Sequence, residues 1–484
     1  MIRLLHVYFP SRMVLLVACE LLVIGLGFFG ATALGGLQAD TAGAYAFGIM
    51  KVLAVVAVFA ASMWYFDLYD PLIITSRREV VARVPQAFGW ATLGMIVLYR
   101  SVPTLRLGGY NFLLGLMTAC LLLVLCREAF RTLISSRRLA SRVIILGNGT
   151  FARSFRREIT RRPELGLELI GSMTCGNGWK LDGQALAVRS FSDAVEKLRA
   201  RLIVLALEDR RGQLPLLELL ALKVKGVRIV DGIEMYERVC GKIPVESLNP
   251  ATLLFCQGFA PSHSHRILKH IFSVVIAIVG LALLWPLMLV VALAVKLSSP
   301  GPVFLRQERV GEGGKTFTLL KFRSMRQDAE SQSGPRWAAA VDDRITGVGR
   351  IIRKCRIDEL PQFFNILRGE MDLIGPRPER PFFVEQLRTE IPYYDQRHIL
   401  KPGITGWAQL KFGYADSTAA SLEKLQYDLY YVKHLSFGLD VVITLLTIKT
   451  VLFGRERMMH EPLPEPVPIS QKASSVAATF QTRS

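Results

Sequence analysis

The amino-acid sequence predicts a membrane protein of several domains: a four-helix transmembrane bundle, a Rossmann-like α/β domain, and a monotopic α/β-type domain with a re-entrant membrane helix. Three observations support this prediction. The chain has 484 residues, more than one ordinary domain holds. Hydrophobic residues make up 51% of it, a high share for a water-soluble protein, and they gather in long blocks. Elsewhere, short apolar runs alternate with helical patterns, which is typical of a parallel sheet.

The net charge and the cysteines indicate which partners and which cell compartment to expect. The formal net charge of +19 fits a partner that is either nucleic acid or an anionic membrane face. The sequence has no pattern typical of a nucleic-acid-binding module, so we expect a membrane and no nucleic acid as partner. The seven cysteines are scattered without the paired spacing of a metal site, as expected for core residues in a reducing compartment.

Four apolar blocks in the N-terminal region, residues 1–135, are expected to cross a bilayer. They cover residues 13–35, 46–66, 86–103 and 111–125. The segments before the first block, between the second and third, and after the fourth contain several arginines, whereas residues 36–45 contain no lysine or arginine. The positive-inside rule therefore places both ends of the bundle in the cytoplasm. The loop with Arg100 and Arg106 agrees less well with this orientation.

Residues 136–260 are expected to form the Rossmann-like α/β domain. A strand that begins at Ser141 leads into Gly147-x-Gly149-x-x-Ala152 and then a helical pattern, the context of a dinucleotide-type phosphate loop. Further strand-like runs alternate with helical segments at 167–172, 202–207 and 227–231. The acid expected after the second strand to hold a ribose is missing, because the chain reads Ser172-Met-Thr-Cys175. We therefore favour a structural or regulatory domain over a bound nucleotide.

The fifth apolar block, residues 271–295, is expected to enter the membrane and return. Pro286 near its middle would remove a backbone hydrogen bond and break the helix. Basic residues on both sides, among them Lys269 and Lys296, favour re-entry over crossing. Re-entry keeps the following residues of the domain 261–455 in the cytoplasm. The Pro-rich tail, residues 456–484, is expected to be disordered.

Two adjacent carboxylates, Asp358 and Glu359, are the centre of the last domain. Pro361 and an apolar run follow them, so we expect a helix to begin here with both acids at its positive end. Several basic residues flank the pair in the sequence, among them Arg353, Arg356 and Arg377. Carboxylates among so many cations indicate a metal-dependent site for a phosphorylated substrate. The alternative is an N-capping aspartate on a solvated basic face.

The segment from Arg266 to about residue 455 resembles the bacterial sugar transferases, or polyprenyl-phosphate glycosyl-1-phosphate transferases. The four helices and the α/β domain resemble the long form of this family. Besides the proline-containing membrane helix, the motifs that carry the resemblance are Pro302-Val-Phe-x-x-Gln-Glu-Arg-Val-Gly311, Lys321-Phe-Arg-Ser-Met325, Asp358-Glu-Leu-Pro-Gln362, Asn365-x-Leu-x-Gly-Glu-Met371, Leu373-Ile-Gly-Pro-Arg-Pro378 and Lys401-Pro-Gly-Ile-Thr-Gly-Trp-Ala-Gln409.

This resemblance implies that residues 261–455 are a catalytic domain, and it implies a reaction. Such an enzyme moves a hexose-1-phosphate from a UDP-sugar to undecaprenyl phosphate, releases UMP, requires Mg²⁺ and begins exopolysaccharide, capsule or O-antigen assembly. The first acid, Asp358, would attack the phosphorus next to the sugar and become an acyl phosphate, while Glu359 would hold Mg²⁺. Asp428 is a further candidate for metal or substrate contact, with helix packing on the membrane as the alternative.

Other residues are given expected roles by the same reasoning. Arginine can bind phosphate with two hydrogen bonds, and surface solvation is the alternative for each candidate. The candidates for phosphate contacts are Lys321, Arg323, Arg353, Arg356 and Arg377. Lys269 and Lys296 would attract the lipid phosphate at the headgroup level. The expected location is the inner (cytoplasmic) membrane of a bacterium, with the catalytic domain on the cytoplasmic face; a homodimer is plausible for a long form.

Two rival functions remain to be compared with this one. A membrane-attached nucleotide-sugar dehydratase or epimerase would need a Tyr-x-x-x-Lys pair, and none of the 13 tyrosines has lysine four residues later. A non-enzymatic membrane scaffold or sensor would leave the Asp358–Glu359 stretch without a purpose. The sequence does not select the sugar.

Overall fold

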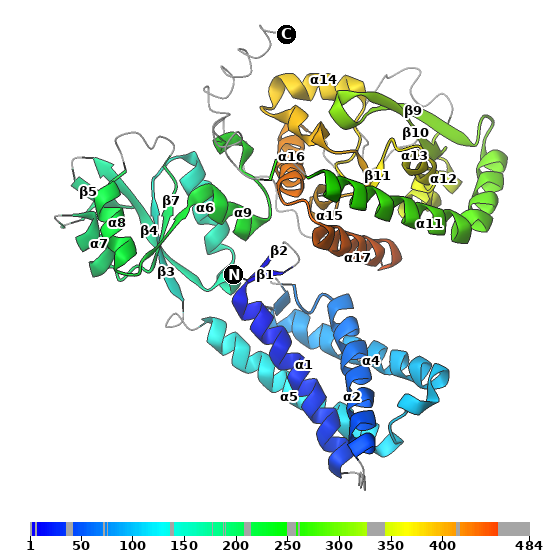
Figure 1. The fold of residues 1–484 in the computed structure, drawn as a ribbon, viewed down its shortest axis with the longest axis horizontal. Helices are drawn as coiled ribbons and strands as arrows, with labels where there is room; N and C mark the ends of the chain where they lie inside the picture. The colour runs from blue at the N-terminus through cyan, green and yellow to red at the C-terminus, as the bar shows by residue number, and fades with distance from the viewer. Residues whose placement is uncertain are drawn as a thin grey trace. The chain divides into compact units, whose positions relative to one another are not determined.

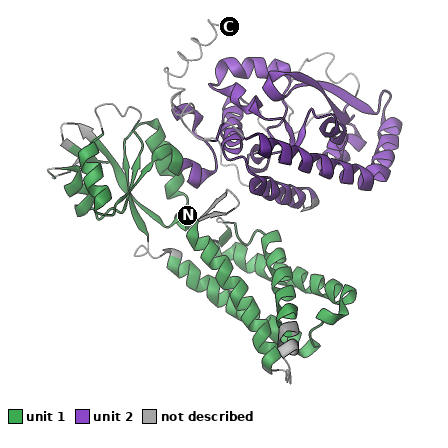
Figure 2. Cartoon of the chain, viewed as in Figure 1, with its two compact units in different colours: residues 1–3, 8–235 green, residues 4–7, 236–484 purple. Residues whose placement is uncertain are grey.

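The structure is a computed structural model of the 484-residue chain (Figure 1). The residues that it describes are 2–4, 7–34, 42–70, 73–74, 76–135, 140–176, 178–186, 188, 190–207, 214–248, 258–259, 262–326, 344–412 and 417–453. The predicted disordered tail lies outside these residues. The chain forms two compact units, Met1–Arg3 with Tyr8–Met235, and Leu4–Val7 with Tyr236–Ser484 (Figure 2).

Four helices of the first unit carry the N-terminal apolar blocks. They are α1 (Ser11–Leu34), α2 (Ala42–Tyr65), α4 (Arg77–Ser101) and α5 (Gly109–Ser135). They share one buried core, in which the rings of Phe28 and Phe59 lie 5.6 Å apart and those of Phe59 and Phe88 lie 5.0 Å apart. Among the described residues, five helices are long and apolar enough to cross a membrane: these four and α11 (His263–Ser298). The prediction of a membrane protein is confirmed at this level; a four-helix bundle within the bilayer stays a prediction.

An ion pair lies inside this helical core. Glu20, the acid within the first apolar block, pairs with Arg127 of α5, whose Nε lies 2.7 Å from a carboxylate oxygen. Both side chains are buried. Arg127 also donates a hydrogen bond to the backbone carbonyl of Leu68 at 3.2 Å. Because a charge in apolar surroundings is costly unless it is paired, this contact explains how α1 accommodates an acid.

The first unit also contains an α/β domain. Its sheet has the strand order β6-β5-β4-β3-β7-β8. The strands are β3 (Ser141–Leu146), β4 (Leu167–Gly176), β5 (Gly178–Leu181), β6 (Gln184–Ala185), β7 (Leu202–Leu205) and β8 (Arg228–Asp231). The four strands β4, β3, β7 and β8 are parallel, and the order reverses between β3 and β7, as in doubly wound folds. Helix α6 (Thr150–Thr160) lies on one side of the sheet, and α7 (Phe191–Lys197) and α8 (Leu216–Val224) lie on the other (Figure 1). The prediction of an α/β domain is confirmed.

The second unit packs helices around two small sheets. The antiparallel pair is β9 (Phe304–Val310) with β10 (Thr316–Phe322), and the parallel pair is β11 (Asp372–Ile374) with β12 (Gly403–Thr405). The helices are α11, α12 (Gly347–Lys354), α13 (Gln362–Leu367), α14 (Pro381–Glu390), α15 (Trp407–Lys411), α16 (Thr418–Lys433) and α17 (Phe437–Phe453). Buried Val295 of α11, Phe322 of β10 and Ile352 of α12 belong to one apolar cluster, which joins the long helix to the hairpin.

The long helix α11 is continuous, which corrects the expectation that Pro286 breaks it. The helix runs over 36 residues with Pro286 inside it. It changes direction before it reaches β9 (Figure 1). A proline removes one helical hydrogen bond and commonly bends a helix without ending it. Re-entry into the membrane stays a prediction.

Apart from Leu4–Val7, the second unit begins at Tyr236, whereas the sequence suggested a boundary at residue 261. Helix α9 (Gly232–Cys240) therefore starts in the first unit and ends in the second. Three contacts attach the segment after it to α15 and α16. Trp407 Nε1 donates to the carbonyl of Gly241, Lys242 pairs with Glu423, and Gln426 donates to Glu246. Pairings so distant in sequence leave no local pattern by which the boundary could be placed.

Candidate active site

A short 3-10 turn, Ile357–Glu359, carries the two carboxylates. Arg356 precedes it in the left-handed region, with φ of +58°, so the backbone leaves the helical conformation of α12 there. The following helix, α13, begins one residue after Pro361. The acids therefore lie in the turn that leads into this helix, close to the helical start that the sequence predicts. Both side chains are buried, with 7% of each residue exposed.

Glu359 is held by two arginines. Its Oε1 accepts a hydrogen bond from Arg377 Nη2 at 3.0 Å, and Arg356 Nη1 lies 3.5 Å away. Burial alone would raise the pKa of Glu359. The charges of Arg377, Arg356 and Lys321 outweigh that effect and hold the pKa below its ordinary value. Glu359 is therefore a carboxylate that stays ionised.

Asp358 is in a different environment, although it is the adjacent residue. Its Oδ1 is buried and has no hydrogen-bond partner among the described residues. Burial and the neighbouring charge of Glu359 raise the pKa of Asp358 to about 6, against the opposing effect of Lys321, Arg353 and Arg356. The unpaired oxygen of Asp358 can form a bond to a substrate atom, and a pKa raised in this way is typical of carboxylates at functional sites.

The cations predicted to contact phosphate are largely gathered around this pair. Lys321, on β10, is close enough to interact electrostatically with both acids. Burial and the charges of Arg309 and Arg377 lower the pKa of Lys321 to about 8, although Glu359 and Asp358 oppose this. Arg353, on α12, lies within electrostatic reach of Asp358. The structure thus brings Lys321, Arg353, Arg356 and Arg377 together around Asp358 and Glu359, as the phosphate-contact hypothesis requires.

Arg323 does not belong to this group, and its phosphate contact stays a prediction that these contacts do not support. Its buried guanidinium donates hydrogen bonds to the carbonyls of Val295, Ser299 and Pro300 at 3.3, 2.7 and 2.8 Å. These carbonyls lie where α11 ends and the following loop begins, where helical carbonyls lack partners. Arg323 therefore satisfies the end of a helix instead of facing the carboxylates.

Lys269, expected to attract the lipid phosphate, is also placed differently. It is 4% exposed, and its Nζ lies 3.2 Å from Asp372 of β11. The neighbouring His270 contacts the other oxygen of that carboxylate, with Nδ1 at 2.8 Å. The long helix is thus joined to β11 by a buried ion pair that includes Lys269, and the contact of Lys269 with a lipid phosphate stays a prediction. Lys296 is exposed and donates to the carbonyl of Gly301.

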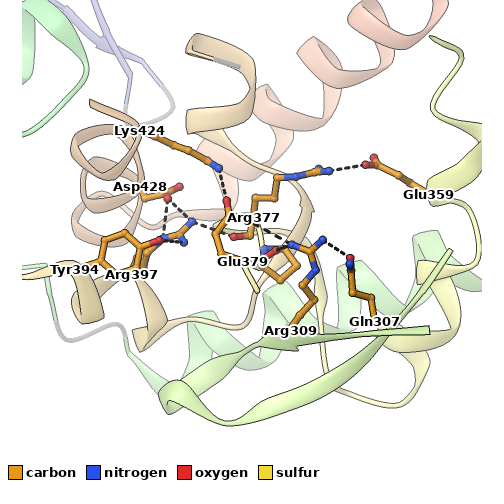
Figure 3. A network of polar contacts seen from close by, with 10 residues as sticks. Gln307, Arg309, Glu359, Arg377, Glu379, Tyr394, Arg397, Lys424 and Asp428 are labelled. Carbon is orange, nitrogen blue, oxygen red and sulfur yellow. Dashed lines mark hydrogen bonds and ion pairs between the residues drawn. The ribbon is translucent and has the colours of Figure 1, made fainter. Parts of the chain in front are cut away.

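Asp428 lies in a second group of charges, which Figure 3 shows together with Glu359 and Arg377 of the first group. Its Oδ2 accepts two hydrogen bonds from Arg397, from Nε at 3.1 Å and from Nη2 at 2.8 Å. Arg397 also donates to the backbone carbonyl of Arg377, whose side chain reaches Glu359. Asp428 is thus joined to the Asp358–Glu359 pair through two arginines. The contacts make it an ion-pair partner of Arg397, and its metal contact stays a prediction.

Four residues of this second group have no role predicted from the sequence: Arg309, Glu379, Arg397 and Lys424. Arg309 donates to the carbonyl of Pro378, and Lys424 pairs with Glu379 with 2.5 Å between Nζ and Oε1. Burial would raise the pKa of Glu379, but Lys424, Arg397 and Arg309 hold it far below its ordinary value. Arg309 belongs to the motif that runs from Pro302 to Gly311, so the sequence did contain a signal for it. Arg397 and Lys424 lie outside every quoted motif.

The fit of the site to Mg²⁺ can be judged from its donors. Mg²⁺ prefers oxygen ligands and is commonly held by one or two carboxylates together with substrate phosphates. Among the described residues, no group of three or more His, Cys, Asp or Glu side chains could hold a metal by itself. The carboxylate of Glu359, which stays ionised, fits an ion that takes its other ligands from a bound diphosphate.

The glycine loop of the α/β domain is explained by packing. Gly147 has φ of +131°, and a Cβ there would lie 2.4 Å from the carbonyl oxygen of Ala206. Gly149 caps α6 with φ of −69°, and Ala152 is fully buried in that helix. The loop has the strand–turn–helix geometry that the motif predicts. The close approach of the loop after β7 is sufficient reason for the glycine at 147.

Comparisons with known proteins find relatives of the second unit, and one of these relatives also aligns with part of the first unit. A family model described as bacterial sugar transferase matches residues 264–454. The chain is 32% identical over 387 residues to an undecaprenyl-phosphate glucose phosphotransferase of Komagataeibacter xylinus, covering 77% of this chain and 71% of that protein.

Two further relatives align over shorter lengths. The chain is 45% identical over 221 residues, 46% of its length, to a UDP-N-acetylgalactosamine-undecaprenyl-phosphate N-acetylgalactosaminephosphotransferase of Aeromonas hydrophila. It is 40% identical over 206 residues, 42% of its length, to a UDP-glucose:undecaprenyl-phosphate glucose-1-phosphate transferase of Escherichia coli (strain K12). These matches span about half of the two relatives, 51% and 44% of their lengths.

Proposed function

Because this chain belongs to the bacterial sugar transferase family, we propose that it moves a sugar 1-phosphate from a UDP-sugar to undecaprenyl phosphate and releases UMP. The relatives named above carry undecaprenyl phosphate in their names, two of them together with a UDP-sugar. The observation that carries the proposal is the buried, unpaired oxygen of Asp358 among cations.

The chemistry runs in two displacements at phosphorus. In the first, an oxygen of ionised Asp358 forms a bond to the phosphorus next to the sugar, and the bond from that phosphorus to the bridging oxygen breaks as UMP leaves. In the second, an oxygen of the lipid phosphate attacks the same phosphorus, and the bond to Asp358 breaks. The carboxylate is regenerated, and the product is a lipid diphosphate that carries the sugar.

The surrounding residues bind and orient the charged groups. Lys321, Arg353 and Arg377 provide positive charge for the phosphates, and Arg356 and Arg377 keep Glu359 ionised. Mg²⁺, when bound beside Glu359, would neutralise the diphosphate and the leaving UMP. Keeping Glu359 ionised maintains a ligand for that ion, while the raised pKa of Asp358 favours bond formation there.

The membrane supplies the acceptor. We place the enzyme in the cytoplasmic membrane with its second unit on the cytoplasmic face, where UDP-sugars are made. The long apolar helix α11, which joins the hairpin through Arg323 and Phe322, would hold the site at the level of the lipid headgroups. The product would then begin the assembly of a polysaccharide repeat.

Release of UMP tests this proposal. Membranes containing the full chain are incubated with undecaprenyl phosphate, Mg²⁺ and one UDP-sugar at a time: UDP-glucose, UDP-galactose or a UDP-acetamido sugar. We expect UMP from at least one donor, and with no lipid present a phosphosugar adduct on Asp358 by peptide mass spectrometry. A donor that supports turnover while Asp358 never acquires the adduct would overturn the two-step route.

A further inference from the structure

The segment Pro376–Glu379, which carries Arg377, is fixed at every backbone carbonyl. Each carbonyl accepts a hydrogen bond from a donor in a different part of the second unit. Gly403 N donates to Pro376 at 3.0 Å, Arg397 Nη2 to Arg377 at 3.0 Å, Arg309 Nη1 to Pro378 at 3.0 Å, and Val310 N to Glu379 at 2.9 Å. Two of the four donors are backbone amides of strands, and two are arginine side chains.

Arg397 is the more deeply held of the two arginines. It is 2% exposed, and it donates from Nε and Nη2 to Asp428 and from Nη1 to the hydroxyl of Tyr394 at 3.0 Å. Asp428 and Tyr394 are themselves buried. With its planar group bound at three nitrogens, Arg397 has little freedom, and its remaining contact is directed at the carbonyl of Arg377 (Figure 3).

The position of that carbonyl determines where the Arg377 side chain can reach. Proline on each side of Arg377 fixes its own φ and restricts the residue before it, so the segment has few conformations. Once the carbonyl is held, the side chain leaves the segment in one direction, toward Glu359 at 3.0 Å. Figure 3 shows Arg377 lying between Glu359 and the second group of charges.

We propose that Arg397 is a positioning residue for the transfer reaction, acting through the backbone of Arg377 on the side chain of Glu359. Asp428 and Tyr394 hold Arg397 in place and so act one step further from the site. The inference rests on the proposed function for its catalytic meaning, whereas the fixing of the 376–379 segment is a property of the fold that can be measured without activity.

Arg397→Lys is the main test. Lysine keeps the buried positive charge beside Asp428 but cannot make the same forked contacts with Asp428 and the Arg377 carbonyl. We expect kcat for UMP release to fall about tenfold to a hundredfold, since small misplacements in an active site have effects of that size. Arg388→Lys is the matched control, because Arg388 is a half-exposed arginine that pairs with Asp395 and Glu385. It should keep kcat within about twofold.

A double-mutant cycle distinguishes positioning from a general structural role. If Arg397 acts through Arg377, adding Arg397→Lys to Arg377→Ala should lower kcat little beyond Arg377→Ala alone. Losses that multiply would overturn the proposal.

Hydrogen exchange provides the readout that needs no turnover. In Arg397→Lys, exchange should quicken in peptides that contain residues 372–379 and 403, and stay unchanged in peptides of α11. If wild-type protein shows this protection but releases no UMP from any donor, the proposed function fails while the fixing of the segment stands. If exchange in the segment does not change, the positioning role is wrong. Should Arg397→Lys not fold, Tyr394→Phe removes one contact of the guanidinium and is judged by the same two measurements.

Discussion

Two stretches of this chain suggested phosphate chemistry, and the structure treats them differently. The Gly147-x-Gly149 loop is a backbone pattern, and a close approach to Ala206 accounts for its first glycine. The Asp358–Glu359 turn is a side-chain pattern, and packing does not account for it, because burying an unpaired carboxylate oxygen costs stability. The comparison shows that a loop motif can be satisfied by the fold itself, whereas a buried carboxylate oxygen without a hydrogen-bond partner points to a ligand.

The largest expected effect tests the second stretch. Asp358→Asn removes the nucleophile while keeping the shape, so UMP release should fall about a thousandfold or more and the phosphosugar adduct should disappear. Asp395→Asn, at a half-exposed aspartate of the same unit, is the control and should retain near wild-type turnover. If Asp358→Asn kept its turnover, the Asp358–Glu359 turn would not be the site of the reaction, and the contrast with the Gly147-x-Gly149 loop would fail.

A stability effect separates Arg323 from the cations that surround the carboxylates. Arg323→Met removes three hydrogen bonds to carbonyls at the end of α11, which should lower the free energy of unfolding by about 3 kcal/mol. The rate per folded molecule should stay close to that of wild type. Arg306→Met, at an exposed position of β9, should change stability by less than about 0.5 kcal/mol. Denaturant titration measures the free energy of unfolding, and UMP release measures the rate. An Arg323→Met variant that is as stable as wild type but slow would contradict the assignment of Arg323 to the end of α11.

The glycine loop is expected to respond in stability alone. Gly147→Ala places a Cβ against a backbone oxygen at a positive φ, so it should lower the free energy of unfolding by about 2 kcal/mol. Gly149→Ala, at φ of −69°, should cost clearly less. Neither should change the rate of transfer by the folded protein. A loss of rate in Gly149→Ala without loss of stability would instead indicate a phosphate bound at this loop.

The smallest expected effect is a change in pH dependence. Asp358 reacts as the ionised carboxylate and has a pKa of about 6, so the rate should fall as pH drops through that value. The positive charge of Lys321 lowers the pKa of Asp358, so Lys321→Gln should raise that pKa and move the acidic limb to higher pH by less than about one unit. The pH–rate profile of kcat/KM measures this. A limb that moves to lower pH would contradict the sign.

Hydropathy and motifs predicted much of this molecule. Long apolar blocks identify membrane helices because hydrophobicity is a property of local sequence, and the family assignment and the transferase class are confirmed by the comparisons. Lys321 and Arg377, which lie near the acids, belong to the motifs, whereas Arg353 was a candidate only as a basic residue that flanks the pair in the sequence.

Other features had no local signal. Arg397 and Asp428 are 31 residues apart, and their pairing depends on tertiary packing. Arg323 belongs to the same motif as Lys321, so its residue type could not reveal that it binds a helix end. Pro286 was expected to break α11, but a helix can bend around a proline.

Three consecutive residues at the end of β10 and just after it make three separate contacts. Lys321 serves the carboxylates, Phe322 packs with Val295, and Arg323 binds the carbonyls at the exit of α11. A shift of one residue along a strand turns every side chain to the opposite face. Inserting or deleting a single residue here would therefore remove all three contacts together. We therefore expect an insertion or a deletion in this segment to be more damaging than a substitution of any one of the three residues.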